Sequence, residues 1–75
     1  MKNYGDYFKA ERKSRNLTQA QLAKAIGVSQ QAISFYENNT NEPCISICEK
    51  LADFYGITID ELIGRNPEDK TNDYV

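Results

Sequence analysis

Three helix-capping patterns within 75 residues constrain the fold of this chain more than any other feature of its sequence. In each pattern a Ser or Thr directly follows one apolar residue and precedes another by four positions. Such a hydroxyl can cap the first turn of a helix, and the two apolar residues then meet as a hydrophobic staple. The patterns are Leu17 with Thr18 and Leu22, Val28 with Ser29 and Ile33, and Ile57 with Thr58 and Leu62. They predict three helices with defined starting points.

The other apolar residues predict two further helices and no strand, because no segment alternates apolar and polar residues with a period of two. The expected helices are 4–14, 19–25, 30–37, a helix that Pro43 begins and Gly56 ends, and 59–63. The helix after Pro43 would turn one stripe inward, made of Ile45, Cys48, Leu51, Ala52 and Tyr55. The fold class is therefore all-α, a compact five-helix bundle. Residues 1–64 form its one domain, and 65–75 form a polar, flexible C-terminal tail.

The second and third predicted helices are separated only by Gly27, Val28 and Ser29. This connection is too short for two antiparallel helices, and it favours the steep crossing of a helix-turn-helix. Gln30 and Gln31 stand at the exposed start of the third helix. A Gln side chain can both donate to and accept from an adenine edge in the DNA major groove. The pair therefore indicates a helix that reads bases.

The charges are unevenly distributed, although the net charge is only −2. Residues 1–39 hold six basic and three acidic side chains, whereas residues 40–75 hold three and eight. This asymmetry favours a polyanion bound by the N-terminal half, with Lys13, Arg15 and Lys24 as candidates for phosphate contacts. The alternative is that these are ordinary solvated charges.

Neither an enzyme nor a metal centre is indicated. The chain has no His and only two cysteines, Cys44 and Cys48, too few to complete a zinc site. We expect both thiols to be small, buried or half-buried apolar residues, with a redox pair as the alternative. No catalytic constellation or glycine-rich phosphate loop is present, and no cofactor is expected. Without a signal peptide or membrane-spanning segment, the protein should be cytoplasmic, and associated with the nucleoid when bound to DNA.

Three segments carry a family resemblance: LTQAQLAKAIGVSQQAISFYEN, Pro43 after a short polar loop, and LADFYGITIDELI. From Phe8 to Ile63 the chain closely resembles the phage repressor and Cro family of helix-turn-helix DNA-binding domains, also called XRE-like. The resemblance implies a lambda-repressor-like domain in which the helix starting near Ser29 enters the major groove. It also implies a homodimer on a palindromic double-stranded operator, and a transcriptional regulator that is a repressor.

The resemblance also assigns roles to residues. Base reading falls to Gln30, Gln31, Ser34 and Phe35, although Phe35 could instead extend the core. Contacts with the DNA backbone fall to Thr18, Gln19, Ser29, Asn39 and Thr40. Arg12 and Glu37 match a structural ion pair, and Ile59, Leu62 and Ile63 match positions where relatives pair, although core packing explains Leu62 equally well. The alternative function is a protein-interaction module, such as an antitoxin or anti-repressor, which uses the acidic C-terminal half.

Overall fold

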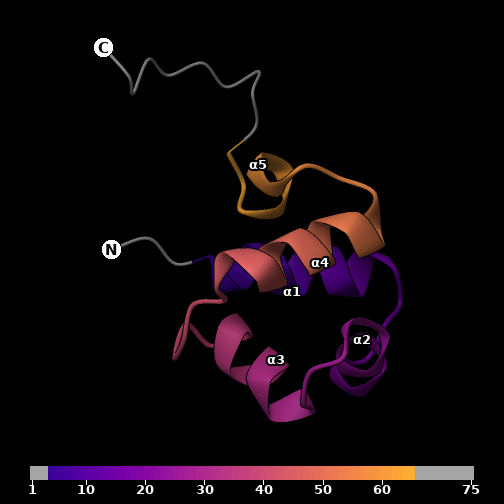
Figure 1. Cartoon of the computed structure of the whole chain (residues 1–75). Helices are drawn as coiled ribbons and strands as arrows, with labels where there is room; N and C mark the ends of the chain where they lie inside the picture. Colours follow the sequence, from indigo (N-terminus) through magenta and orange to yellow (C-terminus); the bar gives the residue numbers. More distant parts are fainter. Residues whose placement is uncertain (1–3, 66–75) are drawn as a thin grey trace.

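The computed structural model describes residues 4–65, and this part of the chain contains five helices and no strand. The helices are α1 Gly5–Ser14, α2 Gln19–Ile26, α3 Gln30–Glu37, α4 Ile45–Tyr55 and α5 Ile59–Leu62. In Figure 1, α2 and α3 lie together at one end of the molecule and α5 lies at the other, with α1 and α4 between them. The prediction of an all-α, five-helix fold is confirmed. Apart from Arg65, the predicted tail lies outside the described residues.

The capping hydrogen bonds of all three patterns form as predicted. The Thr18 hydroxyl accepts a hydrogen bond from the amide of Gln21 (3.0 Å), and the Gln21 side chain accepts one from the amide of Thr18 (2.8 Å). Thr58 and Glu61 make the same reciprocal pair at 3.0 and 2.9 Å. The Ser29 hydroxyl accepts a hydrogen bond from the backbone amide three residues later at 3.1 Å. These bonds satisfy amides at helix starts that have no partner within the helix, so the starting points of α2, α3 and α5 are locally encoded.

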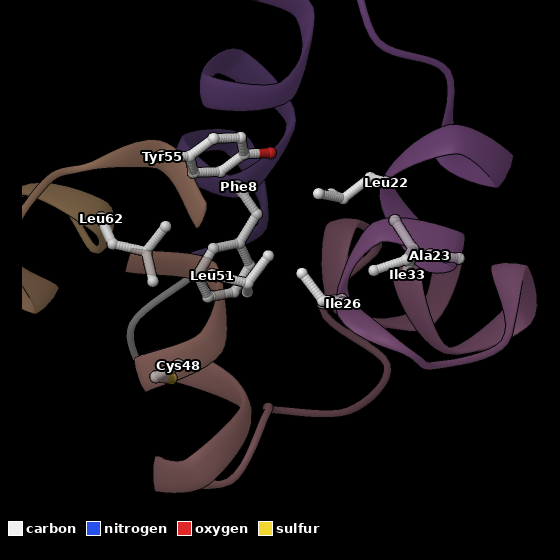
Figure 2. Packing of buried hydrophobic residues seen from close by; sticks show 9 residues of the cluster. All are labelled: Phe8, Leu22, Ala23, Ile26, Ile33, Cys48, Leu51, Tyr55 and Leu62. Atoms are coloured by element: carbon white, nitrogen blue, oxygen red, sulfur yellow. The ribbon is translucent and has the colours of Figure 1, made fainter. Parts of the chain in front are cut away.

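The core lies where the five helices meet, and each helix contributes to it (Figure 2). Its buried apolar residues are Phe8, Leu22, Ala23, Ile26, Ile33, Cys48, Leu51, Ala52, Tyr55 and Leu62. Helix α3 packs on α1 and α2, and α4 packs on α2 and α5. The α2–α3 pair therefore packs against the rest of the bundle.

The start of α4 differs from the prediction. The helix begins at Ile45, with Cys44 as its N-cap, so Pro43 stands just before the helix rather than in its first turn. Ile45 is in phase with the inward stripe but is 69% exposed, although Cys48 in the same turn is buried. Ile47, which is partly buried, packs against the core instead. Both thiols are free, and Cys44 is exposed, so the expectation of two buried cysteines is correct only for Cys48.

Leu62 is a core residue. Its side chain has no exposed surface, so it cannot meet a second copy of the folded chain, and the assignment of Leu62 to a dimer contact is wrong. Ile59 and Ile63 are only partly buried, although they too pack against the core.

Gly5 permits a close approach between α1 and the C-terminal end of α3, which the sequence analysis missed. A Cβ atom at Gly5 would overlap the backbone carbonyl of Glu37. The Gly5 amide donates to the Asn39 side chain (2.9 Å), and Asn39 itself has a left-handed backbone conformation with φ of 62°. A glycine in the first turn of a helix, where Ala is intrinsically preferred, was the available signal.

We expect Gly5→Ala to destabilise the domain by about 1–3 kcal/mol, because the new methyl group must displace backbone atoms rather than a flexible side chain. Urea unfolding measures the change. Ala10→Gly, at an exposed position of α1, is the matched control and should cost about 1 kcal/mol through helix propensity alone. If propensity governed both sites, Gly5→Ala would be stabilising, and that result would contradict the packing argument.

Candidate nucleic-acid interface

The starts of α2 and α3 present free backbone amides. The capping hydroxyls of Thr18 and Ser29 each bind only the third amide of their helix. The first two amides, those of Gln19 and Ala20 in α2 and of Gln30 and Gln31 in α3, have no hydrogen-bond partner within residues 4–65. Free amides and the partial positive charge of a helix N-terminus favour anions such as phosphate. Two such ends belong to adjacent helices of this fold.

The two glutamines of α3 are available for binding. Gln30 and Gln31 are exposed, and their side chains form no hydrogen bond with any described residue. Ser34 is half-buried, and its hydroxyl accepts a weak hydrogen bond from Asn38 (3.4 Å). Phe35 is also half-buried, but it is not among the side chains packed against the core. The alternative role for Phe35, as an extension of the core, therefore loses support.

The predicted ion pair between Arg12 and Glu37 is present and buried. Arg12 Nε donates to Glu37 Oε2 at 2.7 Å, and Nη2 donates to Oε1 at 3.0 Å. Gln19 Nε2 donates to the same Oε1 at 3.0 Å, a contact that the sequence did not reveal. Arg12 also donates to the carbonyl oxygen of Leu17 (2.7 Å). The last residue of α3 is thus joined to α1 and to the first residue of α2, which holds the two helix starts in a defined arrangement.

Both members of the ion pair are held in their charged forms. Burial alone would raise the pKa of Glu37, but hydrogen bonds from Arg12 and Gln19, with the nearby charges of Arg12 and Lys9, lower it below its ordinary value. The hydrogen bond to Glu37 raises the pKa of Arg12. The negative charge of the Glu37 carboxylate is therefore balanced by Arg12 inside the bundle, so it does not repel a polyanion.

The lowered pKa of Glu37 predicts a loss of stability in acid. A carboxyl group whose pKa is lower in the folded state stabilises the fold fully above its ordinary value of 4.5. That contribution disappears as the pH falls below this value and through the lowered folded pKa. Thermal unfolding between pH 7 and pH 2 measures the effect. The double variant Arg12→Met with Glu37→Met should lose less stability on acidification, and an unchanged acid profile in that variant would refute the role of Glu37.

The basic residues that were predicted to contact the DNA backbone divide into two groups. Lys13 and Lys24 are exposed and form no ion pair with a described residue. Arg15 is only partly exposed, and its guanidinium has partners in α1 and α4. Its guanidinium donates to the Glu11 carboxylate (2.6 Å) and to the carbonyl oxygen of Tyr55 (3.4 Å), and it lies 4.2 Å from the centre of the Tyr55 ring. These contacts give Arg15 a role between α1 and α4, and its predicted contact with the DNA backbone stays a prediction.

The loop after α3 offers side chains rather than amides. The backbone amides of Asn39 and Thr40 donate to carbonyl oxygens of α3, at 3.3 and 2.9 Å, so they are not free for phosphate. The loop turns back on α3 and satisfies the backbone carbonyls there. The side-chain amide groups of Asn39 and Asn41 and the Thr40 hydroxyl remain as donors.

Within residues 4–65 no group of three or more His, Cys, Asp or Glu side chains is placed to hold a metal ion. None of the described helices is long and apolar enough to cross a membrane.

Two helices joined at a tight turn, with exposed glutamines at the start of the second, define a helix-turn-helix unit. The helix-turn-helix family model matches residues 8–62. An uncharacterized HTH-type transcriptional regulator of Methanocaldococcus jannaschii, MJ0272, is 39% identical over 62 residues, which cover 83% of this chain and 89% of the relative. RstR, a transcriptional repressor of cryptic phage CTXphi in Vibrio cholerae, is 42% identical over 52 residues, covering 69% of this chain and 47% of the relative. This chain therefore belongs to the XRE-like helix-turn-helix family.

The fold comparison agrees with the family assignment. The P22 c2 repressor, solved in complex with the synthetic operator 9T, matches with a TM-score of 0.78 and 30% identity, covering 88% of this chain and 100% of that chain. The SOS-response repressor LexA from Eubacterium rectale matches with a TM-score of 0.76 and 26% identity, covering 81% and 65%.

Proposed function

We propose that this protein is a sequence-specific regulator of transcription, a repressor, which binds double-stranded DNA with α3 in the major groove. The observation that carries the proposal is the pair of exposed, unbonded glutamine side chains at a helix start whose amides are free. The buried pair of Arg12 and Glu37 supports it, because it holds α3 against α1 without leaving an uncompensated acid. The similarity to a repressor solved on its operator adds support.

In the proposed complex, Gln30 and Gln31 read bases, with Ser34 and Phe35 at the next positions along α3. Adenine suits the glutamines, because it offers an acceptor and a donor on its major-groove edge, and a thymine methyl group suits Phe35. Phosphates would lie at the two helix starts, near Thr18, Gln19 and Ser29. The side chains of Lys13, Lys24, Asn39 and Thr40 complete the proposed backbone contacts.

We further propose that the protein binds as a homodimer on a palindromic operator. A single small module gains affinity when a second copy occupies a half-site one helical turn away. Helix α5 lies at the end remote from α2 and α3 (Figure 1), and its first residue Ile59 and its C-cap Ile63 are the proposed contact residues. We assign no catalytic activity or cofactor to the protein, and we place it in the cytoplasm, at the nucleoid when bound.

A protein-interaction role is the second candidate, and one relative favours it. Antitoxin PezA of Streptococcus pneumoniae is 29% identical over 62 residues, although these cover only 39% of that protein. In this role the acidic C-terminal half would meet a partner protein.

Selection of bound sites from random double-stranded DNA separates the two candidates. The repressor proposal requires enrichment of two symmetric half-sites, centred about 10 base pairs apart and containing adenine at the positions facing α3. Titration with salt then shows how much of the affinity depends on phosphate contacts. A failure to enrich any site would reject sequence-specific DNA binding and leave the protein-interaction role.

A further inference from the structure

The hydroxyl group of Tyr55 has no hydrogen-bond partner although it is buried. Tyr55 is the last residue of α4 and only 9% exposed. Its Oη atom is shielded from solvent and bonds to no described residue. Figure 2 shows this oxygen directed toward Leu22, into the interior of the apolar cluster. Buried hydroxyl groups are normally hydrogen-bonded, and phenylalanine would fill the same place without a polar atom.

A small cavity is lined by both Tyr55 and Glu37. Its lining includes Tyr55, Glu37 and the apolar side chains of Phe8, Leu22 and Ile33. The free space admits about one water-sized sphere, which is close to the minimum that a buried water needs. Burial raises the pKa of Tyr55 to about 12, so its hydroxyl remains protonated at physiological pH and can donate. The site is too small for an organic ligand.

Glu37, one of the residues that line this cavity, retains one acceptor position. Its Oε1 accepts hydrogen bonds from Arg12 and Gln19, whereas Oε2 accepts only the bond from Arg12 Nε. Each oxygen of a carboxylate has two acceptor sites, so Oε2 has one left. No direct hydrogen bond joins Tyr55 to Glu37. One water can bridge a donor and an acceptor that are too far apart to bond directly.

We propose that this cavity is a binding site for one structural water, which accepts a hydrogen bond from Tyr55 Oη and donates one to Glu37 Oε2. The water satisfies both buried groups. It also adds α4 to a network that already contains Arg12 of α1, Gln19 of α2 and Glu37 of α3. One carboxylate then connects four of the helices, and the proposal holds whether or not the protein binds DNA.

Two measurements on the full 75-residue chain test the site. A high-resolution crystal structure should show a water within hydrogen-bonding distance of both oxygens, and the same structure of Tyr55→Phe should lack it. Tyr55→Phe should also lower Tm by about 4–8 °C, because the substitution removes a bridged hydrogen bond to a charged group. Tyr7→Phe, at a 47% exposed tyrosine, is the matched control and should shift Tm by less than about 3 °C.

The sign of the Tm change separates a bridged hydroxyl from an unpaired one. If the hydroxyl were dry and unpaired, Tyr55→Phe would remove an unfavourable buried group and raise Tm. A raised Tm, or a cavity without water in the crystal structure of the unsubstituted protein, overturns the proposal.

Discussion

Arg12→Met should lower the free energy of unfolding by about 3–5 kcal/mol, more than the substitution of any charged residue outside this ion pair among residues 4–65. Both members of the pair are buried, with Arg12 7% and Glu37 4% exposed. Without the guanidinium, Glu37 keeps a side-chain hydrogen bond from Gln19 but becomes a buried charge without an ion-pair partner. Folded domains are stable by only about 5–15 kcal/mol, so this loss removes a large part of the total.

Urea unfolding at low temperature measures this loss, and two variants interpret it. Lys13→Met removes an exposed cation from the same helix and should change the stability by less than about 0.5 kcal/mol. Arg12→Met combined with Glu37→Met should recover most of the loss, since apolar residues can often replace a buried ion pair without cost. If Arg12→Met proved as stable as the unsubstituted protein, the pair would not hold α1 to α3.

The features that could be predicted from the sequence are local ones. The capping hydroxyls of Thr18, Ser29 and Thr58 act on amides three residues away, so their function depends on little beyond the neighbouring residues. The Gly27 turn, with φ of 79°, likewise follows from a single residue type. The ion pair of Arg12 and Glu37, which are 25 positions apart, came from the family resemblance rather than from local pattern.

The features that were missed depend on neighbours from other helices. Periodicity places Ile45 on the inward stripe, but it does not reveal where the surrounding helices end. A positive charge marks Arg15 as a phosphate candidate, yet the ring of Tyr55, 40 positions later, determines where its guanidinium lies. The need for Gly5 arises from the backbone of Glu37. Each of these depends on tertiary contacts that pattern and composition do not contain.

Replacing Gln30 and Gln31 together by Ala should weaken binding to the selected operator by about 2–6 kcal/mol, or roughly 30-fold to 20,000-fold. Each bidentate contact between Gln and adenine contributes about 1–3 kcal/mol of discrimination, and adjacent positions need not be additive. Both side chains are exposed and form no hydrogen bond with the described chain, so the fold should keep its Tm. The substitution tests recognition separately from stability.

Fluorescence anisotropy with the operator and with a scrambled duplex measures the effect. Affinity for the scrambled duplex should not change, because phosphate contacts at the helix starts and lysines remain. The Lys50→Ala control, at an exposed position on α4 outside the interface, should keep its preference for the operator. Equal weakening on both duplexes would mean that the glutamines add only general affinity. Unchanged binding to both duplexes would mean that the start of α3 does not contact the DNA. The repressor proposal would then lose the observation that carries it.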